Sequence, residues 1–172
     1  METERLIITQ FDKSFTSSVQ RLSVEPSNWE FIPDEAFKTE KDAELRIESL
    51  IEAYNGTEGP FVYPVLLKGS RIHIGHVEVA SLGEGQWEIG YHIGEAWQNV
   101  GYATEAVRYF VPYIMQKLNI STLYVICRAD NIASRRVLEK TNFSLIEEKS
   151  GEYHGKPALI RRYVCSIPRT IT

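Results

Sequence analysis

Short runs of apolar or alternating residues mark several strands along this chain. RLIITQ (5–10) predicts a first strand, and three more runs follow at FVYPVLLK (61–68), RIHIGHVEVA (71–80) and QWEIGYHI (86–93). The segments between the last three runs, KGS and SLGEG, are short and contain glycine. These three strands are therefore expected to form antiparallel hairpins.

Other stretches carry apolar residues at helical spacing. Residues 15–24 and 39–54 are expected to be helical, and the longest apolar face lies over residues 102–118. Pro112 lies inside that last segment. It is expected to kink or interrupt the helix, because its ring crowds the carbonyl of Arg108.

The remainder of the chain predicts a strand, a short helix and a hairpin. STLYVICRA (121–129) has the character of a buried strand, and Asp130 or Asn131 is expected to cap the helix that follows it. Asn142 suits the left-handed conformation that ends many helices. FSLIEEKS and PALIRRYVCSI are expected to pair around GEYHGK. The order of elements predicts an α/β fold with a mixed sheet, in a single domain over residues 1–172.

Composition narrows the class of protein further. The chain is 43% hydrophobic, which is enough for a packed core and excludes a disordered chain. Its 19 basic and 23 acidic side chains give a net charge of −4, so no nucleic-acid partner is expected. No apolar run approaches the ~18–20 residues that span a membrane, and METERLIITQ lacks the pattern of a secretory signal. We therefore expect a cytoplasmic protein without a membrane partner.

The cysteines and histidines do not suggest a metal site. Cys127 and Cys165 each lie in an apolar strand-like run, so they are expected to be reduced core thiols. The four histidines form no recognised ligand pair. His73 and His76 flank a glycine in RIHIGHVEV, where their alternation favours a strand over a zinc site. We predict no metal.

WQNVGYATEA (97–106) is the segment most suggestive of chemistry. A strand ends, a loop with Gly101 follows and a helix begins, so unpaired backbone N–H groups and the positive end of the helix dipole point to one place. A phosphate is the natural ligand there, with Ala103 keeping the approach open and Thr104 adding a hydroxyl. The alternative is an ordinary turn between strand and helix. Neither GxxxxGK[ST] nor GxGxxG occurs in the chain.

Two motifs and the N-terminus together resemble a known family. EIGYHIGEAWQNVGYATEAV resembles motif A of the GNAT acyl-CoA N-acyltransferase superfamily, with Gln98, Gly101 and Ala103 at its signature positions. RADNIASRRVLEKTNF, which opens a helix near Asn131 and Ser134, resembles motif B. TERLIITQF is similar to the start of the RimJ/RimL-like branch, which acetylates ribosomal-protein N-termini and various small amines.

The resemblance implies acetyl-CoA as co-substrate. Its pyrophosphate would lie on the backbone amides from Val100 to Thr104, and its pantetheine would run beside the end of the 86–93 strand. In the family this strand bulges and splays from its neighbour, and one of its amides faces the thioester carbonyl. The residues expected to contact acetyl-CoA are Tyr91, His92, Ile93, Gln98, Asn99, Val100, Gly101, Tyr102, Ala103, Thr104, Asn131 and Ser134.

The leaving thiolate needs a hydrogen-bond donor. Many GNAT proteins have a tyrosine four residues after the motif-B alanine or serine, but that position is Leu138 here. The RimJ/RimL-like branch implies Ser134 as the donor instead, with Asn131 fixing the pantetheine or an ordered water. The alternative for both residues is that they cap the start of a helix.

The attacking amine must lose a proton. Glu88, in EIGY, is the first candidate for the base because the family often has a glutamate there. Glu78 in HVEV is the second candidate and His92 the third. The alternative is that Glu88 is only hydrogen-bonded across the sheet and that solvent takes the proton.

These inferences predict an N-acetyltransferase that transfers an acetyl group to a primary amine by direct attack in a ternary complex. The acceptor would be a protein N-terminus or a small amine, and aromatic residues such as Trp29 and Phe31 would either line its groove or form a satellite core cluster. A homodimer is a family-level expectation. The second hypothesis is a catalytically silent acyl-CoA-binding module used for sensing or regulation.

Overall fold

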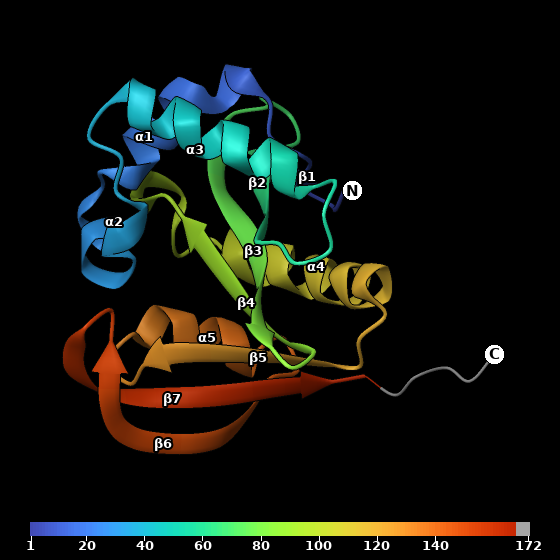
Figure 1. Cartoon of the computed structure of the whole chain (residues 1–172), viewed down its shortest axis with the longest axis vertical. Helices are drawn as coiled ribbons and strands as arrows, with labels where there is room; N and C mark the ends of the chain where they lie inside the picture. Colours follow the sequence, from blue (N-terminus) through green and yellow to red (C-terminus); the bar gives the residue numbers. More distant parts are fainter. Residues whose placement is uncertain (168–172) are drawn as a thin grey trace.

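A seven-stranded mixed sheet, with helices on both faces, organises the computed structural model of this chain, which describes residues 1–167 (Figure 1). The strands lie in the order β1-β2-β3-β4-β5-β7-β6. Their bounds are β1 Leu6–Ile8, β2 Phe61–Leu67, β3 His73–Gly83, β4 Gln86–Ile93, β5 Thr122–Arg128, β6 Ser144–Tyr153 and β7 Lys156–Ser166. The α-helices are α1 Thr16–Ser23, α2 Pro26–Phe31, α3 Glu40–Ala53, α4 Tyr102–Leu118 and α5 Ile132–Glu139, and the 3₁₀ turns are η1 Lys13–Phe15, η2 Pro33–Glu35 and η3 Glu95–Trp97. The mixed α/β architecture is the one predicted.

Alternation along the strands divides the hydrophobic core between the two faces of the sheet. Odd-numbered residues of β3, such as Val77 and Val79, pack with Phe110 and Ile114 of α4 in the main core. Even-numbered residues of β2 pack on the other face in a smaller cluster, which is made of Phe11, Phe15, Ile47, Leu50, Val62 and Leu66. The helices α1 to α3 thus cover one face, and α4 with α5 covers the other.

The sheet is interrupted between β4 and β5. All other neighbouring strands pair antiparallel, whereas β4 and β5 are parallel and share one registered pair, Glu88 with Tyr124. The two strands part after this pair, which confirms the expected splay and leaves the β4–β5 opening.

The prediction of a bulge in β4 is wrong on the side where β4 pairs with β3. The register runs without a shift from Ser81–Trp87 to Gly75–Ile93, and the shift in this hairpin lies nearer its turn, between Ser81 and Gly83. Gly75 explains the regular pairing, because the place of its missing Cβ is taken by the carbonyl of His92.

Most helix ends follow the local signals in the sequence. Thr39 and Asp42 form a reciprocal capping box at the start of α3, and Asn131, rather than Asp130, caps α5. Asn142 has a φ of 64°, as its left-handed role predicts. The short elements α2 and η2 between residues 26 and 35 were not predicted.

The expected interruption at Pro112 is wrong. α4 runs unbroken from Tyr102 to Leu118 with Pro112 inside it. Both Pro112 and Arg108, whose carbonyl loses its helical partner, are exposed, so water can hydrogen-bond to that carbonyl.

The two cysteines are free and buried, as predicted. His73 is buried as well: its Nδ1 lies 2.8 Å from Ser18 Oγ and its Nε2 lies 2.9 Å from the carbonyl of Gly75. Within residues 1–167, no helix combines the length and the apolar character needed to cross a bilayer.

Candidate functional site

Unpaired backbone donors gather at the start of α4. Asn99 (φ 63°) and Gly101 (φ 90°) both adopt the left-handed conformation, and no side chain caps the helix. Across residues 1–167, no protein acceptor receives the N–H groups of residues 99–104, a stretch formed by Asn99, Val100, Gly101, Tyr102, Ala103 and Thr104. Six free donors at the positive end of a 17-residue helix make a site for a phosphate group.

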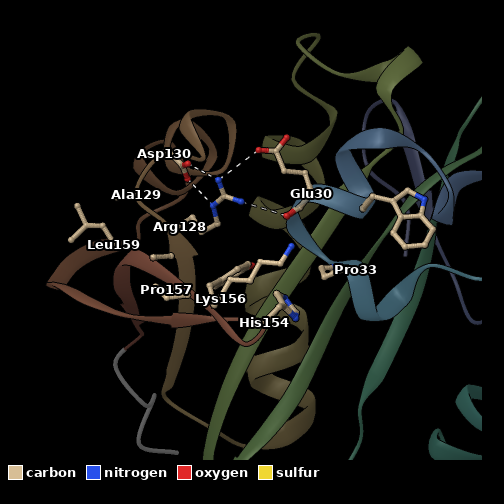
Figure 2. A pocket seen from close by; sticks show the side chains of 12 residues that line it. Glu30, Pro33, Arg128, Ala129, Asp130, His154, Lys156, Pro157 and Leu159 are labelled. Carbon is tan, nitrogen blue, oxygen red and sulfur yellow. Dashed lines mark hydrogen bonds and ion pairs between the residues drawn. The ribbon is translucent and has the colours of Figure 1, made fainter.

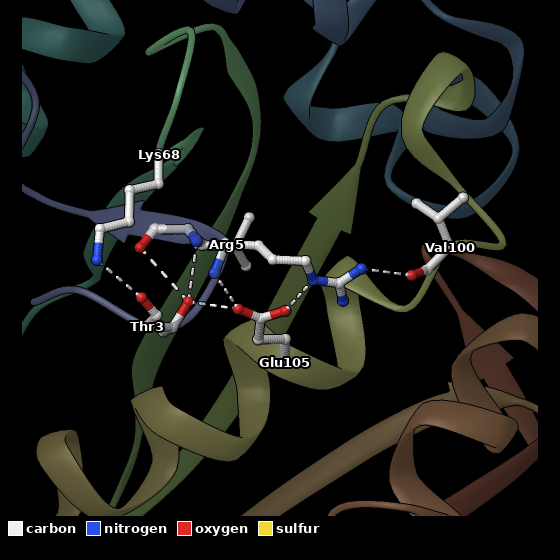
Figure 3. A network of polar contacts seen from close by, with 6 residues as sticks. Thr3, Arg5, Lys68, Val100 and Glu105 are labelled. Atoms are coloured by element: carbon white, nitrogen blue, oxygen red, sulfur yellow. Dashed lines mark hydrogen bonds and ion pairs between the residues drawn. The ribbon is translucent and has the colours of Figure 1, made fainter.

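A charged network from the residues just before β1 supports this loop (Figure 3). Arg5 Nη1 donates to the carbonyl of Val100 at 3.1 Å, and Arg5 Nε pairs with Glu105 Oε2 at 2.6 Å. The backbone N–H of Arg5 donates to Glu105 Oε1 at 2.8 Å, and the hydroxyl of Thr3 donates to the same oxygen. Burial alone would raise the pKa of Glu105, but the hydrogen bonds from Thr3 and Arg5 outweigh burial and lower it. Glu105 therefore balances the charge of Arg5, which leaves the backbone amides as the main anion ligands.

No pattern in the sequence marked Arg5 as a functional residue. Because its guanidinium fixes the Val100 carbonyl, the Arg5→Ala variant is expected to have a KM for acetyl-CoA raised about fivefold to tenfold, with kcat changed less than about twofold. Steady-state kinetics measure both constants.

The matched control is Arg108→Ala. Arg108 lies on α4 and donates to the carbonyl of Lys140, away from the loop, so this variant removes an equal charge. An equal rise of KM in both variants would contradict a local role for Arg5.

Gln98 braces the loop against β4. Its side-chain Nε2 donates to the carbonyl of Ile93 at 2.8 Å. This bond ties the loop to the end of the strand and occupies the Ile93 carbonyl. The structure thus gives Gln98 a supporting contact, in addition to the cofactor contact expected of it.

Glu88 lies where β4 and β5 part. Its Oε1 accepts the N–H of Ile126 at 3.1 Å, so the carboxylate takes the place of a backbone partner that β4 no longer offers. This is the cross-sheet bond foreseen as the alternative to catalysis, although one oxygen remains free. Burial raises the pKa of Glu88, and the bond from Ile126 acts against that rise.

Glu78 lies across β4 because Gly90 has no side chain. The two residues are register partners, and a Cβ on Gly90 would lie 2.5 Å from Glu78 Oε1. Within residues 1–167 no hydrogen bond to the carboxylate of Glu78 contributes to its pKa. Burial raises its pKa to about 7, with the charge of Glu35 adding to the rise. A buried carboxyl group near neutrality suits proton transfer.

His92 follows on the same face of β4. Its ring lies 5.9 Å from that of His76, and its buried Nε2 has no hydrogen-bond partner within residues 1–167. Burial lowers the pKa of His92 to about 4. A base that weak accepts a proton poorly at neutral pH, so His92 is the least suited of the three candidates.

On the opposite face of β4, Tyr91 meets the start of α5. Its phenol oxygen lies 2.9 Å from Ser134 Oγ and donates to the Ser134 carbonyl at 3.1 Å. Asn131 Oδ1 accepts the Ser134 N–H at 3.0 Å, which is the capping role considered for it. Cys127 is close by: burial raises the pKa of its thiol, and the Ser134 hydroxyl acts against that rise.

A pocket of about 430 Å³ lies between the α2–η2 segment, the end of β5 and the β6–β7 turn (Figure 2). Arg128 crosses it, paired with Asp130 at 2.5 Å and with Glu30 at 3.6 Å. His154 and Asp34, 2.7 Å apart, join the turn to η2. The residues that line the pocket are Trp29, Glu30, Pro33, Arg128, Ala129, Asp130, Tyr153, His154, Lys156, Pro157, Ala158 and Leu159.

Tyr153 lines this pocket, and the charges of Glu88 and Glu78 influence its phenol. Burial, aided by the charge of Glu88 and to a smaller extent that of Glu78, raises its pKa to about 12. Trp29 is 45% exposed and contributes to neither core cluster. Neither core cluster includes Trp29, Phe31 or Phe37, and Trp29 lines a cavity.

The mixed sheet, the free donors before α4 and the β4–β5 opening are the features expected of a GNAT acetyltransferase, and similarity to known proteins shows that family. The profile of the Acetyltransferase (GNAT) domain matches residues 5–144, and the chain belongs to this family of N-acetyltransferases. The uncharacterized N-acetyltransferase YnaD of Bacillus subtilis (strain 168) is 30% identical over 139 residues, which cover 80% of this chain and 78% of YnaD.

Solved structures share the fold over nearly the whole chain. A GNAT-family acetyltransferase from Bacillus anthracis superposes with a TM-score of 0.82 at 24% identity, covering 96% of this chain and 97% of that one. Ribosomal-protein-S5-alanine acetyltransferase from Vibrio fischeri has a TM-score of 0.83 at 18% identity, covering 100% and 98%. RimL, solved in complex with coenzyme A, has a TM-score of 0.82 at 18% identity and covers 96% of both chains. The structural neighbours thus include RimJ/RimL-type enzymes.

Proposed function

We propose that this chain transfers an acetyl group from acetyl-CoA directly to a primary amine bound in the same ternary complex. The observation that carries this proposal is the set of free donors at residues 99–104, beside the β4–β5 opening. The donors suit the diphosphate of coenzyme A, and the opening suits the pantetheine arm.

Direct transfer is favoured over an acyl-enzyme. The thiol nearest the opening is Cys127, and burial raises its pKa, so it is mostly in the neutral form. A neutral thiol is a poor nucleophile. The amine nitrogen would instead attack the thioester carbonyl, forming the C–N bond as the C–S bond breaks. The ammonium gives up two protons in all, and the coenzyme A thiolate takes one of them.

Two carboxylates on the α2 side of β4 would handle the amine. Glu88 has one free oxygen to hold the ammonium, and Glu78 has no competing partner and a pKa of about 7, so we assign the proton to Glu78. On the other face, the Ser134 hydroxyl would donate to the departing sulfur. A thiolate is a stable leaving group, so a hydrogen bond is sufficient assistance there.

The acceptor would approach through the 430 Å³ pocket, which Tyr153 helps to line. A space of this size admits a small amine or the first residues of a peptide. Several structural neighbours bear names of ribosomal-protein acetyltransferases, and another, MccE, was solved with acetyl-CoA and AMP. Both protein N-termini and small amines are therefore the acceptors to test.

The test is thiol release from acetyl-CoA in the presence of a panel of primary amines and N-terminal peptides. We expect release with at least one acceptor and none without an amine. Coenzyme A binding, measured by calorimetry, is the companion experiment. Tight binding with no release across the panel would favour the silent acyl-CoA-binding module over the enzyme.

The Ser134→Ala variant tests the leaving-group donor. Turnover is expected to fall about tenfold, because the developing thiolate loses a hydrogen bond, while the affinity for acetyl-CoA changes little. Single-turnover rates and calorimetry separate the two effects. Unchanged turnover would remove Ser134 from the mechanism.

A further inference from the structure

Tyr91 stands out among the buried polar groups that the mechanism above leaves unused. It belongs to β4 and packs against the main core, yet its phenol oxygen reaches the first turn of α5, 43 residues further along the chain. Within residues 1–167, both of its polar contacts are with one residue, Ser134, through the hydroxyl at 2.9 Å and the carbonyl at 3.1 Å. Because both contacts of the phenol are with Ser134, any function of the Tyr91 hydroxyl is expected to act through that serine.

The count of protons shows what the contact can do. The phenol and the serine hydroxyl carry one proton each, and each oxygen can also accept. If the phenol proton points to the Ser134 carbonyl, the serine can rest by donating to the phenol oxygen. If the phenol proton points to Ser134 Oγ, the serine proton is free for another acceptor. The pair therefore switches the serine hydroxyl between a resting and a donating orientation without any change of protonation.

The surroundings keep both members of the pair ready. Burial raises the pKa of Tyr91 well above its ordinary value, so the phenol remains protonated and can always donate. The bond from the Ser134 N–H to Asn131 fixes the start of α5, which holds the serine opposite the phenol. Leu138, where many GNAT proteins have a tyrosine, is fully buried in the core, so the phenol beside Ser134 comes from β4 instead.

Resting on the proposed function, we infer that Tyr91 is a positioning residue that directs the Ser134 hydroxyl toward the leaving sulfur. As the C–S bond breaks, the serine hydrogen bond turns to the sulfur, and the phenol donates to Ser134 Oγ in its place. The polarised hydroxyl is then a stronger donor to the thiolate. No proton needs to leave Tyr91.

A double-mutant cycle tests this inference with Tyr91→Phe, Ser134→Ala and the combined variant. Tyr91→Phe is expected to lower kcat about tenfold while the KM for acetyl-CoA stays within about twofold. In the Ser134→Ala background the same change is expected to have no further effect on kcat, because the phenol has no hydroxyl left to direct. A merely structural tyrosine would lower stability equally in both backgrounds and would not produce this coupling.

The matched control is Tyr54→Phe. Tyr54 is also a partly buried tyrosine with hydrogen bonds to the backbone, at Phe11 and Val62, but it lies at the C-terminal end of α3, in another part of the structure. This variant is expected to lower the melting temperature and leave kcat unchanged.

Two results would overturn the inference. Either a Tyr91→Phe variant with the kcat of the wild type, or equal losses in the wild-type and Ser134→Ala backgrounds, would show that Tyr91 does not act through Ser134. A wild-type chain that releases no thiol with any amine contradicts the proposed function itself and, with it, the role of Tyr91. Thermal unfolding of each variant confirms that the kinetics refer to folded protein.

Discussion

Replacing Gly75 by alanine is expected to destabilise this protein by about 3–5 kcal/mol, which corresponds to a fall in melting temperature of roughly 6–20 °C. A Cβ at this position would lie 2.0 Å from the carbonyl oxygen of His92 and 2.9 Å from the Cα of Ile93. Both atoms belong to the backbone of β4, so no side-chain rotation relieves the overlap. The strands β3 and β4 would have to separate at the end of the sheet that borders the loop before α4.

Gly69→Ala is the control for this variant. Gly69 follows β2 in the turn before β3, and a Cβ there meets no atom within 4 Å. Its melting temperature is expected to stay within about 2 °C of the wild type. If Gly75→Ala had the same melting temperature as Gly69→Ala, this result would contradict the close approach of β3 and β4.

Replacing Gly90 by alanine is expected to lower kcat about tenfold while leaving the fold intact. The added Cβ would lie 2.5 Å from Glu78 Oε1, and this time the overlapping atom is the end of a flexible side chain. The carboxylate can therefore move aside at little cost in stability, but it leaves its place over β4. Kinetics and thermal unfolding of the same preparation distinguish these two effects.

The dependence on pH adds a second readout. The carboxyl group of Glu78 has a pKa of about 7, raised from 4.5 mainly by burial. If Glu78 accepts the proton, the rate of the wild type rises with pH as this group ionises near pH 7. In Glu78→Gln the rise in rate near pH 7 is expected to disappear. In Gly90→Ala the rise is expected at lower pH, because the pKa of Glu78 falls as its carboxyl group moves toward solvent.

Stability is expected to change with pH in the opposite sense. A carboxyl group whose pKa is raised by folding binds its proton more tightly in the folded state. Its contribution is fully present below pH 4.5 and is lost as the pH rises through about 7. Glu78→Gln should flatten this decline.

Glu88 offers the contrasting result. Glu88→Gln keeps a side-chain oxygen for the Ile126 N–H but removes the charge. If Glu88→Gln abolishes the rise near neutral pH while Gly90→Ala retains both the rise and the wild-type kcat, then Glu88 is the base and Glu78 is a structural residue.

Local patterns in the sequence were sufficient to predict most of this fold. The helix over 39–54, the hairpins after residue 60 and the cap at Asn131 all depend on residues close in sequence, and the structure confirms them. The same is true of the loop before α4, where Gly101 and the start of an amphipathic helix are adjacent. The interruption expected as one effect of Pro112 was wrong, because it depends on whether the freed carbonyl of Arg108 can reach water, which the sequence does not reveal.

The parts of the site that the sequence did not predict join residues far apart in the chain. Arg5 and Glu105 are 100 positions apart, and Tyr91 and Ser134 are 43 apart. The role of Gly90 could not be predicted for the same reason: Glu78 of the neighbouring strand occupies the space that a side chain on residue 90 would need. Such pairs depend on strand register, which alternation alone leaves undetermined.

The six free amides at residues 99–104 have a consequence for turnover. The diphosphate that these amides suit is the same in coenzyme A and in acetyl-CoA. Binding at the diphosphate therefore cannot distinguish the product from the substrate. Free coenzyme A should compete with acetyl-CoA for the enzyme, and discrimination between them must come from the thioester end, near Tyr91 and Ser134. The more tightly these amides bind the nucleotide part of coenzyme A, the more the release of this product limits kcat.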